Sequence, residues 1–194
     1  MENWKKNEIV SVESSLPQKW IKYSEQDETV LYVGSLIKNK GVGELLIIAP
    51  KLITIKPNLK FVFCGSGPYK QHMVHMLNAF EEGNFEKAKM IASAGEFVTE
   101  LKIEDHFLKI DRRVRDRIIF TGLLESKTIS DLIPLCTVIV NPSRNSESFC
   151  MRTIESLCVG VTPIANNHSW FAELLNCIET SYPELGEVIK VDRQ

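Results

Sequence analysis

The stretch Thr29-Val30-Leu31-Tyr32-Val33-Gly34 is a short apolar run, rich in β-branched and aromatic residues, that stops at a glycine. Such a run predicts a buried β-strand. The same pattern returns in Lys60-Phe61-Val62-Phe63-Cys64, which is followed by Gly65-Ser66-Gly67-Pro68. Shorter apolar runs recur at 117–120, 137–140 and 161–165. Because these runs are continuous rather than alternating, we expect strands that are covered on both faces of a parallel sheet.

Helical segments separate the expected strands. Apolar residues at helical spacing predict helices over 43–56, 69–79, 126–135 and 151–158, and Pro50 predicts a bend or a shortened helix in the first. Strands that alternate with helices predict an α/β fold, a doubly wound and mostly parallel sheet of the Rossmann-like type. The charged residues 81–116 are interpreted as an inserted helical excursion with a solvated face.

Composition and charge exclude several classes of protein. The chain has 194 residues, of which 44% are hydrophobic and 25% charged, as in ordinary globular domains. The 23 basic and 25 acidic residues give a net charge of −2, which offers no case for nucleic acid as a partner. The polar N-terminus lacks the apolar core of a signal peptide, and no apolar run reaches the ~20 residues that span a bilayer.

The cysteines and the N-terminal residues indicate the class of protein and the limits of its domain. The five cysteines are an odd number without metal-type spacing, and several of them lie in apolar runs, which predicts small buried thiols at those positions. We therefore expect a reduced, cytoplasmic protein without a metal site. Residues 1–28 are polar and are interpreted as a lead-in or connector, so that the Rossmann-like domain covers 29–194.

In parallel sheets, ligands bind outside the carboxyl ends of the strands, so the loops after the strands are the candidate sites. The loop that starts at Gly34 and Ser35 offers a glycine turn, a hydroxyl group and two lysines, Lys38 and Lys40, before a helix. These groups suit an anion such as phosphate, although lysine beside glycine is also common in ordinary loops. We interpret 165–170 as another such strand-end loop.

The turn Gly65-Ser66-Gly67-Pro68 permits close backbone approach between a strand and a helix. It is neither a complete dinucleotide-binding fingerprint nor a P-loop. A tight turn with no ligand is therefore the alternative interpretation.

Two glutamates mark the segment that follows the fourth expected strand. Glu147 and Glu155 are separated by seven residues, which would place them about 80° apart on one regular helix. If Glu147 lies on a loop and Glu155 lies in the next helix, both could face a single crevice. There they could accept hydrogen bonds from sugar or ribose hydroxyls, as acidic residues do in dinucleotide sites. On spacing alone, two solvated surface glutamates are the alternative.

Taken in order, these segments resemble the C-terminal, nucleotide-sugar-binding domain of retaining glycosyltransferases with the GT-B fold, the glycosyl transferases group 1 family that includes glycogen and sucrose-phosphate synthases. The matching pieces are Val30–Leu36, Lys40-Gly41, Phe61–Pro68, Ile119–Gly122, Asn141-Pro142-Ser143, Glu147–Glu155 and Gly160–Ala165. They cover roughly residues 29–175 apart from the insertion.

The resemblance implies a donor site and a reaction. Lys40 matches the lysine that grips the donor diphosphate, Glu147 the glutamate that contacts the transferred sugar, and Glu155 the glutamate that binds ribose. Backbone groups of further residues would meet the sugar, the distal phosphate or the base: Phe149, Cys150, Met151, Leu123 and Leu124. The strand-end residues that complete this implied donor site are Gly34, Ser35, Gly65 and Gly67. In this family, the transfer retains anomeric configuration and needs no metal or other cofactor.

Two departures from the family pattern keep a second function open. Ser35 stands where the family usually has arginine, and Cys150 stands where it usually has glycine. A regulatory or pseudo-enzyme module that binds nucleotide sugars without turnover is therefore the alternative to an active transferase. A sugar-nucleotide epimerase fits the glutamate motif less well. Because we find no second set of strands for an acceptor lobe, the expected partners are a nucleotide sugar and a missing N-terminal lobe, and we expect the isolated domain to be inactive alone.

Overall fold

The computed structural model of the chain describes residues 27–94, 102–144, 151–167, 169–183 and 190–191. They form a six-stranded sheet in the order β3-β2-β1-β4-β5-β6, and each described strand pair is parallel. The strands are β1 (Glu28–Val33), β2 (Leu59–Cys64), β3 (Ile118–Gly122), β4 (Val138–Asn141), β5 (Thr162–Asn166) and β6 (Lys190–Val191). This is the strand order of doubly wound Rossmann-type sheets, so the expected fold class is confirmed.

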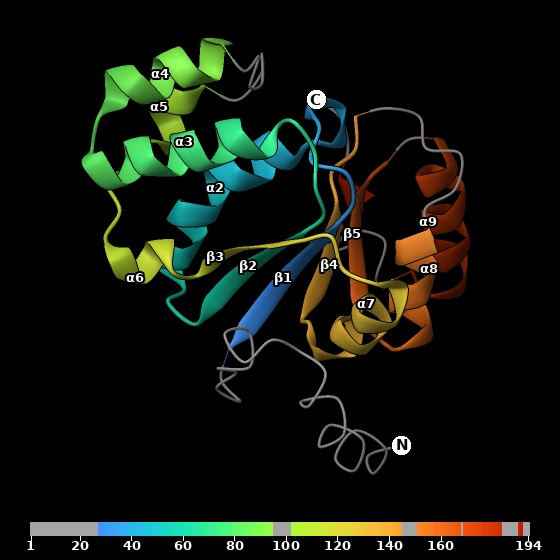
Figure 1. Cartoon of the computed structure of the whole chain (residues 1–194). Helices are drawn as coiled ribbons and strands as arrows, with labels where there is room; N and C mark the ends of the chain where they lie inside the picture. The colour runs from blue at the N-terminus through green and yellow to red at the C-terminus, as the bar shows by residue number, and fades with distance from the viewer. Residues whose placement is uncertain (1–26, 95–101, 145–150, 168, 184–189, 192–194) are drawn as a thin grey trace.

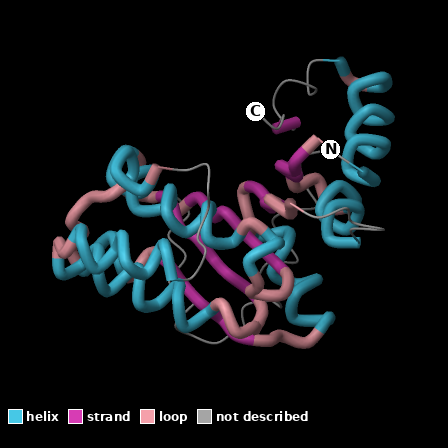
Figure 2. Tube along the Cα trace, turned by 90° about the horizontal axis from the view of Figure 1, so that it is seen from above, coloured by secondary structure: helices cyan, strands magenta, loops and turns pink. Residues whose placement is uncertain are grey.

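Helices flank both faces of this sheet, as Figure 1 and, from above, Figure 2 show. The segments between β1 and β3 are η1 (Lys38–Lys40), α2 (Val42–Ile55), α3 (Lys70–Glu82), α4 (Phe85–Ala94), α5 (Ile103–His106) and α6 (Arg112–Arg115). Those that follow β3 are α7 (Ser126–Leu132), η2 (Ile133–Leu135), α8 (Met151–Cys158) and α9 (Ser169–Ser181). The first group lies on one side of the sheet and α7, α8 and α9 lie on the other (Figure 1).

The strands are apolar throughout because both of their faces are buried. Val30 and Tyr32 pack into the core beneath α2 and α3. Leu31, between them in the sequence, points to the opposite face and packs with residues of α7 and η2. Successive side chains of a strand alternate between faces, so a sheet with helices on both sides selects the continuous apolar runs seen in the sequence.

Helix α2 differs from the sequence expectation at Pro50. The helix runs unshortened over 14 residues with Pro50 buried inside it, so of the two expected alternatives, a bend or a shortened helix, the shortened helix is excluded. Proline removes one backbone hydrogen bond, a local cost that packing can offset. Here the buried face that includes Leu46, Ala49 and Ile53 anchors the helix to the sheet, and most helix stability in proteins comes from such tertiary packing.

The insertion expected at about 81–116 is helical where it is described, in α4, α5 and α6. It has the expected solvated face, since Glu86 and Lys89 of α4 are exposed. Its other face, which the sequence does not predict, buries Ala88, Ile103 and Ile110 in the main core. The Phe107 ring also meets Phe80 edge-on, with ring centroids 5.3 Å apart. The segment therefore extends the hydrophobic core on the α3 side of the sheet.

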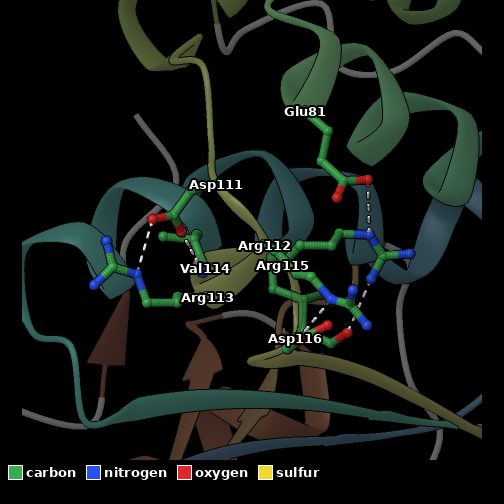
Figure 3. A network of polar contacts seen from close by, with 8 residues as sticks. Glu81, Asp111, Arg112, Arg113, Val114, Arg115 and Asp116 are labelled. Atoms are coloured by element: carbon green, nitrogen blue, oxygen red, sulfur yellow. Dashed lines mark hydrogen bonds and ion pairs between the residues drawn. The ribbon is translucent and has the colours of Figure 1, made fainter.

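The arginines of α6 are matched by nearby carboxylates (Figure 3). The ion pairs are Arg113 with Asp111 at 3.0 Å, Arg112 with Asp116 at 3.6 Å and Arg115 with Glu81 at 3.6 Å. Asp111 also caps the helix, since its carboxylate accepts a hydrogen bond from the Val114 backbone N–H at 3.0 Å. This basic run is thus locally neutralised, and the Arg115 pair ties α6 to α3.

Helix α9 was not expected from the sequence. It begins at Ser169, so the loop expected over 165–170 is shorter than predicted. Phe171 and Leu175 are buried against Ala165 of β5. A signal was present, because Trp170, Phe171, Leu174, Leu175 and Ile178 recur at helical spacing.

Candidate functional site

The candidate site lies at the carboxyl ends of the central strands. The strand order reverses between β1 and β4, which is where doubly wound sheets open a crevice for ligands. The loop after β1 is fixed by the loop after β2: Gly34 N–H donates to the Cys64 carbonyl and Leu36 N–H to the Ser66 carbonyl, both at 2.9 Å. The Tyr32 hydroxyl donates to the Ser35 carbonyl at 2.8 Å. These bonds hold the backbone around Ser35 in place.

Glycines allow these two loops to touch. A Cβ atom at Gly65, where φ is +148°, would lie 2.9 Å from the carbonyl carbon of Gly34, and one at Gly67 would lie 2.7 Å from that of Leu36. Real Cβ atoms are not found this close to backbone. Both glycines are therefore required for contact between the loops, which favours the tight-turn interpretation of this sequence.

The first of two adjoining pockets, the β1/β4 pocket, has a volume of about 210 Å³. It is lined by Tyr32, Val33, Gly34, Ser35, Lys40, Asn141, Ser143 and Phe171. Lys40 ends η1, and Gly41 follows it with a φ of +69°. The pocket thus combines a hydroxyl group, amide groups and an ammonium group, which together suit a phosphate.

The loop after β4 is joined to the other side of this pocket. Arg144 N–H donates to the Asn39 carbonyl at 2.8 Å, next to Lys40. The Asn166 side-chain amide donates to the Ser143 carbonyl at 2.9 Å. These bonds connect the ends of β1, β4 and β5 around the pocket, so its lining residues come from a rigid edge.

The second pocket, the β2/β3 pocket, has a volume of about 270 Å³ and shares Val33, Gly34 and Ser35 with the first. Its other lining residues are Cys64, Gly65, Ser66, Leu123, Leu124 and Ile129. The Leu123 side chain is 78% exposed at its rim. An apolar rim beside a polar pocket is an arrangement that suits a flat ring joined to a charged group.

Charged and sulfur groups lie beside the β2/β3 pocket. Burial raises the pKa of the Cys64 thiol, while a hydrogen bond with Thr121, the positive charge of Arg152 and the Leu124 backbone partly offset the rise. Arg152 Nη1 lies 2.5 Å from Glu155 Oε2 within α8. Its influence on Cys64 places the Arg152 charge within electrostatic reach of the pocket.

The structure brings most of the described candidate residues to this edge. Gly34, Ser35 and Lys40 line the β1/β4 pocket, and Gly65, Leu123 and Leu124 line the β2/β3 pocket. Gly67 lines neither pocket.

The remaining candidates belong to the segment at α8. Met151 begins this helix and is 54% exposed, and Glu155 lies one turn further along it, paired with Arg152. Glu147, Phe149 and Cys150 lie outside the described residues.

Sequence reasoning missed some residues of the pockets. Phe171 was missed because α9 was not expected, and Cys64 was interpreted only as a buried thiol. Arg152 lies within the glutamate motif, but the spacing of the two carboxylates alone predicts no role for it. An arginine one turn before a candidate glutamate on the same helix was the available signal.

A larger cavity of about 750 Å³ lies at the opposite, amino edge of the sheet. Its lining includes Asp27, Lys60 and Arg117. The Asp27 carboxylate pairs with both cations, at 2.9 Å from Arg117, and its side chain is only 6% exposed. Because these charges already satisfy one another and ligands of such folds bind at the carboxyl edge, we assign the candidate site to the two pockets there.

Within the described parts of the chain, no group of three or more histidine, cysteine, aspartate or glutamate side chains is arranged to hold a metal ion. None of the helices described there is long and apolar enough to cross a membrane.

Comparison with known proteins places the chain among glycosyltransferases. The family model described as "Glycosyl transferases group 1" matches residues 16–182. Among solved structures, Anabaena Alr3699/HepE in complex with UDP and glucose is 17% identical with a TM-score of 0.51, over 84% of this chain and 35% of that chain. OtsA without ligand is 12% identical with a TM-score of 0.52, over 87% and 36% of the two chains.

A trehalose-6-phosphate synthase studied with bisubstrate glycomimetics is 11% identical with a TM-score of 0.52, over 87% of this chain and 36% of that chain. At such identities these likenesses show the fold. The chain spans about a third of the length of these proteins. Among curated proteins, none matches the sequence.

Proposed function

Because the chain belongs to the glycosyl transferases group 1 family, the family that its ordered motifs indicate, we propose that it is the donor-binding domain of a retaining glycosyltransferase. The enzyme would transfer a sugar from a nucleotide-diphosphate sugar to an acceptor. The observation that carries the proposal is the β1/β4 pocket, which lies at the switch point of the sheet and combines Ser35 with Lys40. The HepE structure that holds UDP and glucose supports a nucleotide sugar as the ligand class.

The two pockets suggest how a donor would lie. The diphosphate would sit at Ser35 and Lys40, where amide groups and the ammonium group favour negative charge. The base would lie against Leu123 and Leu124 in the β2/β3 pocket. Glu155 would accept hydrogen bonds from the ribose hydroxyls.

The sugar would be held by the segment before α8. Glu147 would contact its hydroxyls, and backbone groups around Phe149, Cys150 and Met151 would meet the sugar and the distal phosphate. This part of the proposal rests on the family motif.

The chemistry asked of this domain is electrostatic. When the bond between the anomeric carbon and the diphosphate oxygen breaks, the diphosphate leaves with an additional negative charge. A fixed cation such as Lys40 stabilises this charge more in the transition state than in the bound donor. We propose that the transfer needs no metal, which is tested by comparing activity in EDTA with activity in Mg²⁺.

Thermal-shift titration with UDP-, GDP- and ADP-sugars tests donor binding. We expect at least one donor to stabilise the domain, and absence of stabilisation by all of them at millimolar concentration would overturn the proposal. Lys40→Ala should weaken binding of the nucleoside diphosphate about 10- to 100-fold, the usual effect of losing a hydrogen bond to a charged group. Lys38→Ala is the matched control, since Lys38 lies in the same turn but does not line either pocket.

The two glutamates should separate in the same assay. Glu155→Ala should weaken binding of the nucleotide itself, whereas Glu147→Ala should mainly alter discrimination between sugars. Equal effects of both variants on the plain nucleotide would contradict the proposed division between ribose and sugar.

A regulatory or pseudo-enzyme module remains the second candidate, because Ser35 replaces an expected cation. We propose that the 194-residue chain binds donor but does not transfer sugar alone, since one lobe does not enclose a reaction from water. Sugar transfer should be assayed for this chain alone and for a protein in which the chain is joined to a second lobe. Transfer by the two-lobed protein indicates an enzyme, and donor binding without transfer indicates a regulatory module. The anomeric configuration of the product, read by NMR, tests retention.

Free thiols at Cys64, Cys136, Cys158 and Cys177 support the further proposal of a reducing, cytoplasmic location.

A further inference from the structure

We propose that Arg152 supplies the donor diphosphate with the positive charge that this chain lacks at Ser35, an inference that rests on the proposed function. Ser35 lines both pockets and brings a neutral hydroxyl to the point where they meet. Lys40 lines only the β1/β4 pocket. A diphosphate carries more negative charge than one ammonium group neutralises, so a second cation from another element would complete its site.

The first turn of α8 is docked onto the site by a buried hydrogen bond. Asn141, which ends β4 and lines the β1/β4 pocket, donates from its side-chain amide to Thr153 Oγ1 at 2.9 Å. Thr153 is fully buried. Arg152 is its neighbour in the chain, so this bond fixes the position of the Arg152 backbone relative to the pocket.

The Arg152 charge also lies within electrostatic reach of the β2/β3 pocket. The guanidinium acts electrostatically on Cys64, which lines the β2/β3 pocket together with Ser35. The Asn141–Thr153 bond and the influence on Cys64 connect Arg152 to both pockets. The point that the pockets share is where the diphosphate is proposed to lie.

The Arg152–Glu155 ion pair prepares both groups for a donor. The side chains are 24% and 31% exposed, so a ligand can contact the pair while its surroundings partly exclude water. A guanidinium has five N–H donors, and the contact at 2.5 Å uses Nη1. Glu155 can thus remain paired and accept ribose hydroxyls while other N–H groups of Arg152 bind a phosphate oxygen.

The test compares binding of a nucleoside diphosphate with binding of the matching nucleoside, using UDP with uridine, GDP with guanosine and ADP with adenosine. Arg152→Gln should weaken binding of the diphosphate that wild type binds about 10- to 100-fold and change nucleoside binding by less than about twofold. Ser35→Arg, added to Arg152→Gln, should restore most of the lost affinity. Arg115→Gln is the matched control, because Arg115 is also 24% exposed and ion-paired but lies on α6 (Figure 3).

The outcomes separate this inference from the proposed function. If wild type binds a diphosphate and Arg152→Gln weakens diphosphate and nucleoside equally, Arg152 only positions Glu155 and the inference is wrong. Failure of wild type to bind any of the three diphosphates overturns the proposed function as well. Arg152→Lys, which keeps the charge, should retain most diphosphate affinity, and a loss as large as that of Arg152→Gln would contradict a role of the charge even if the glutamine variant folds poorly.

Discussion

Gly41 connects the stability of the fold to the geometry of the site, so replacing it with alanine should lower both the stability of the chain and its affinity for a nucleoside diphosphate. Gly41 has a φ of +69°, and a Cβ atom there would lie 2.8 Å from the carbonyl carbon of Pro142. Ordinary van der Waals contacts of Cβ atoms begin at about 3.4 Å. Gly41→Ala therefore introduces both an unfavourable backbone conformation and a collision between the loops after β1 and β4.

Gly160 separates these two effects. It has a φ of +74° at the end of α8, but a Cβ atom there would meet nothing within 4 Å. Gly160→Ala should therefore show only the left-handed backbone penalty of about 1–2 kcal/mol. Gly41→Ala should add about 1–3 kcal/mol for the displaced loop, as overpacking does. The expected loss of unfolding free energy is thus about 2–5 kcal/mol for Gly41→Ala.

Urea unfolding at fixed pH and temperature measures both variants, and nucleotide titration adds a second readout. Because Lys40 and Ser143 lie next to the colliding residues and both line the β1/β4 pocket, Gly41→Ala should also weaken diphosphate binding. Gly160→Ala should leave binding unchanged. Equal losses of stability in the two variants would refute the close approach of Gly41 to Pro142.

Three further predictions concern the reactivity of the cysteines, the cap of α6 and the ion pairs at the amino edge of the sheet. Because burial raises the pKa of Cys64, alkylation at pH 8, mapped by mass spectrometry, should modify the exposed Cys158 and Cys177 well before Cys64, and equally fast labelling of Cys64 would contradict its burial. The Val114 N–H and Arg113 lower the pKa of Asp111 below its ordinary 3.8, so its contribution to stability is present above that value and lost as the pH falls through the lowered native pKa. Asp111→Ala should lower the Tm at pH 7, and the difference in Tm between this variant and wild type should become smaller toward pH 3. A difference in Tm that stays constant with pH would contradict a contribution of the ionised Asp111 carboxylate to stability. Asp27→Ala should cost about 2–3 kcal/mol in urea unfolding, since it leaves two partly buried cations without their shared carboxylate, and a loss below 0.5 kcal/mol would contradict that role.

The sheet could be predicted from the sequence because each central strand is an apolar run that ends at a strong stop signal. β1 ends before Gly34, and β2 ends before Gly65. Parallel strands buried on both faces leave this signature, and it does not depend on distant contacts. Their parallel direction follows from the alternation of strands and helices, whereas their order is known only from the structure.

Other features depend on tertiary contacts that local patterns do not reveal. Pro50 predicts a bend or a shortened helix locally, but the buried face of α2 keeps the helix at its full length. The charges of residues 81–116 predict the solvated face of this insertion, but not its second face, where a few apolar side chains such as Ile103 and Ile110 are buried in the core. Some charged side chains of this insertion are paired with one another, as Arg113 is with Asp111.

In the candidate site too, some residues could be predicted from the local sequence and others depend on tertiary contacts. Ser35 and Lys40 could be proposed because both follow a strand end, and the structure places both in one pocket. Phe171 and Arg152 could not be assigned in this way. Phe171 lines the β1/β4 pocket from a helix that follows β5. The Arg152 charge lies within electrostatic reach of Cys64 because α8 packs beside the sheet.

A crystal structure of the chain with the nucleoside diphosphate that stabilises it most would test the central claim most directly. The account predicts that the diphosphate lies between Ser35 and Lys40 and that the base lies against Leu123 and Leu124. A nucleotide bound instead in the amino-edge cavity beside Asp27 would contradict it.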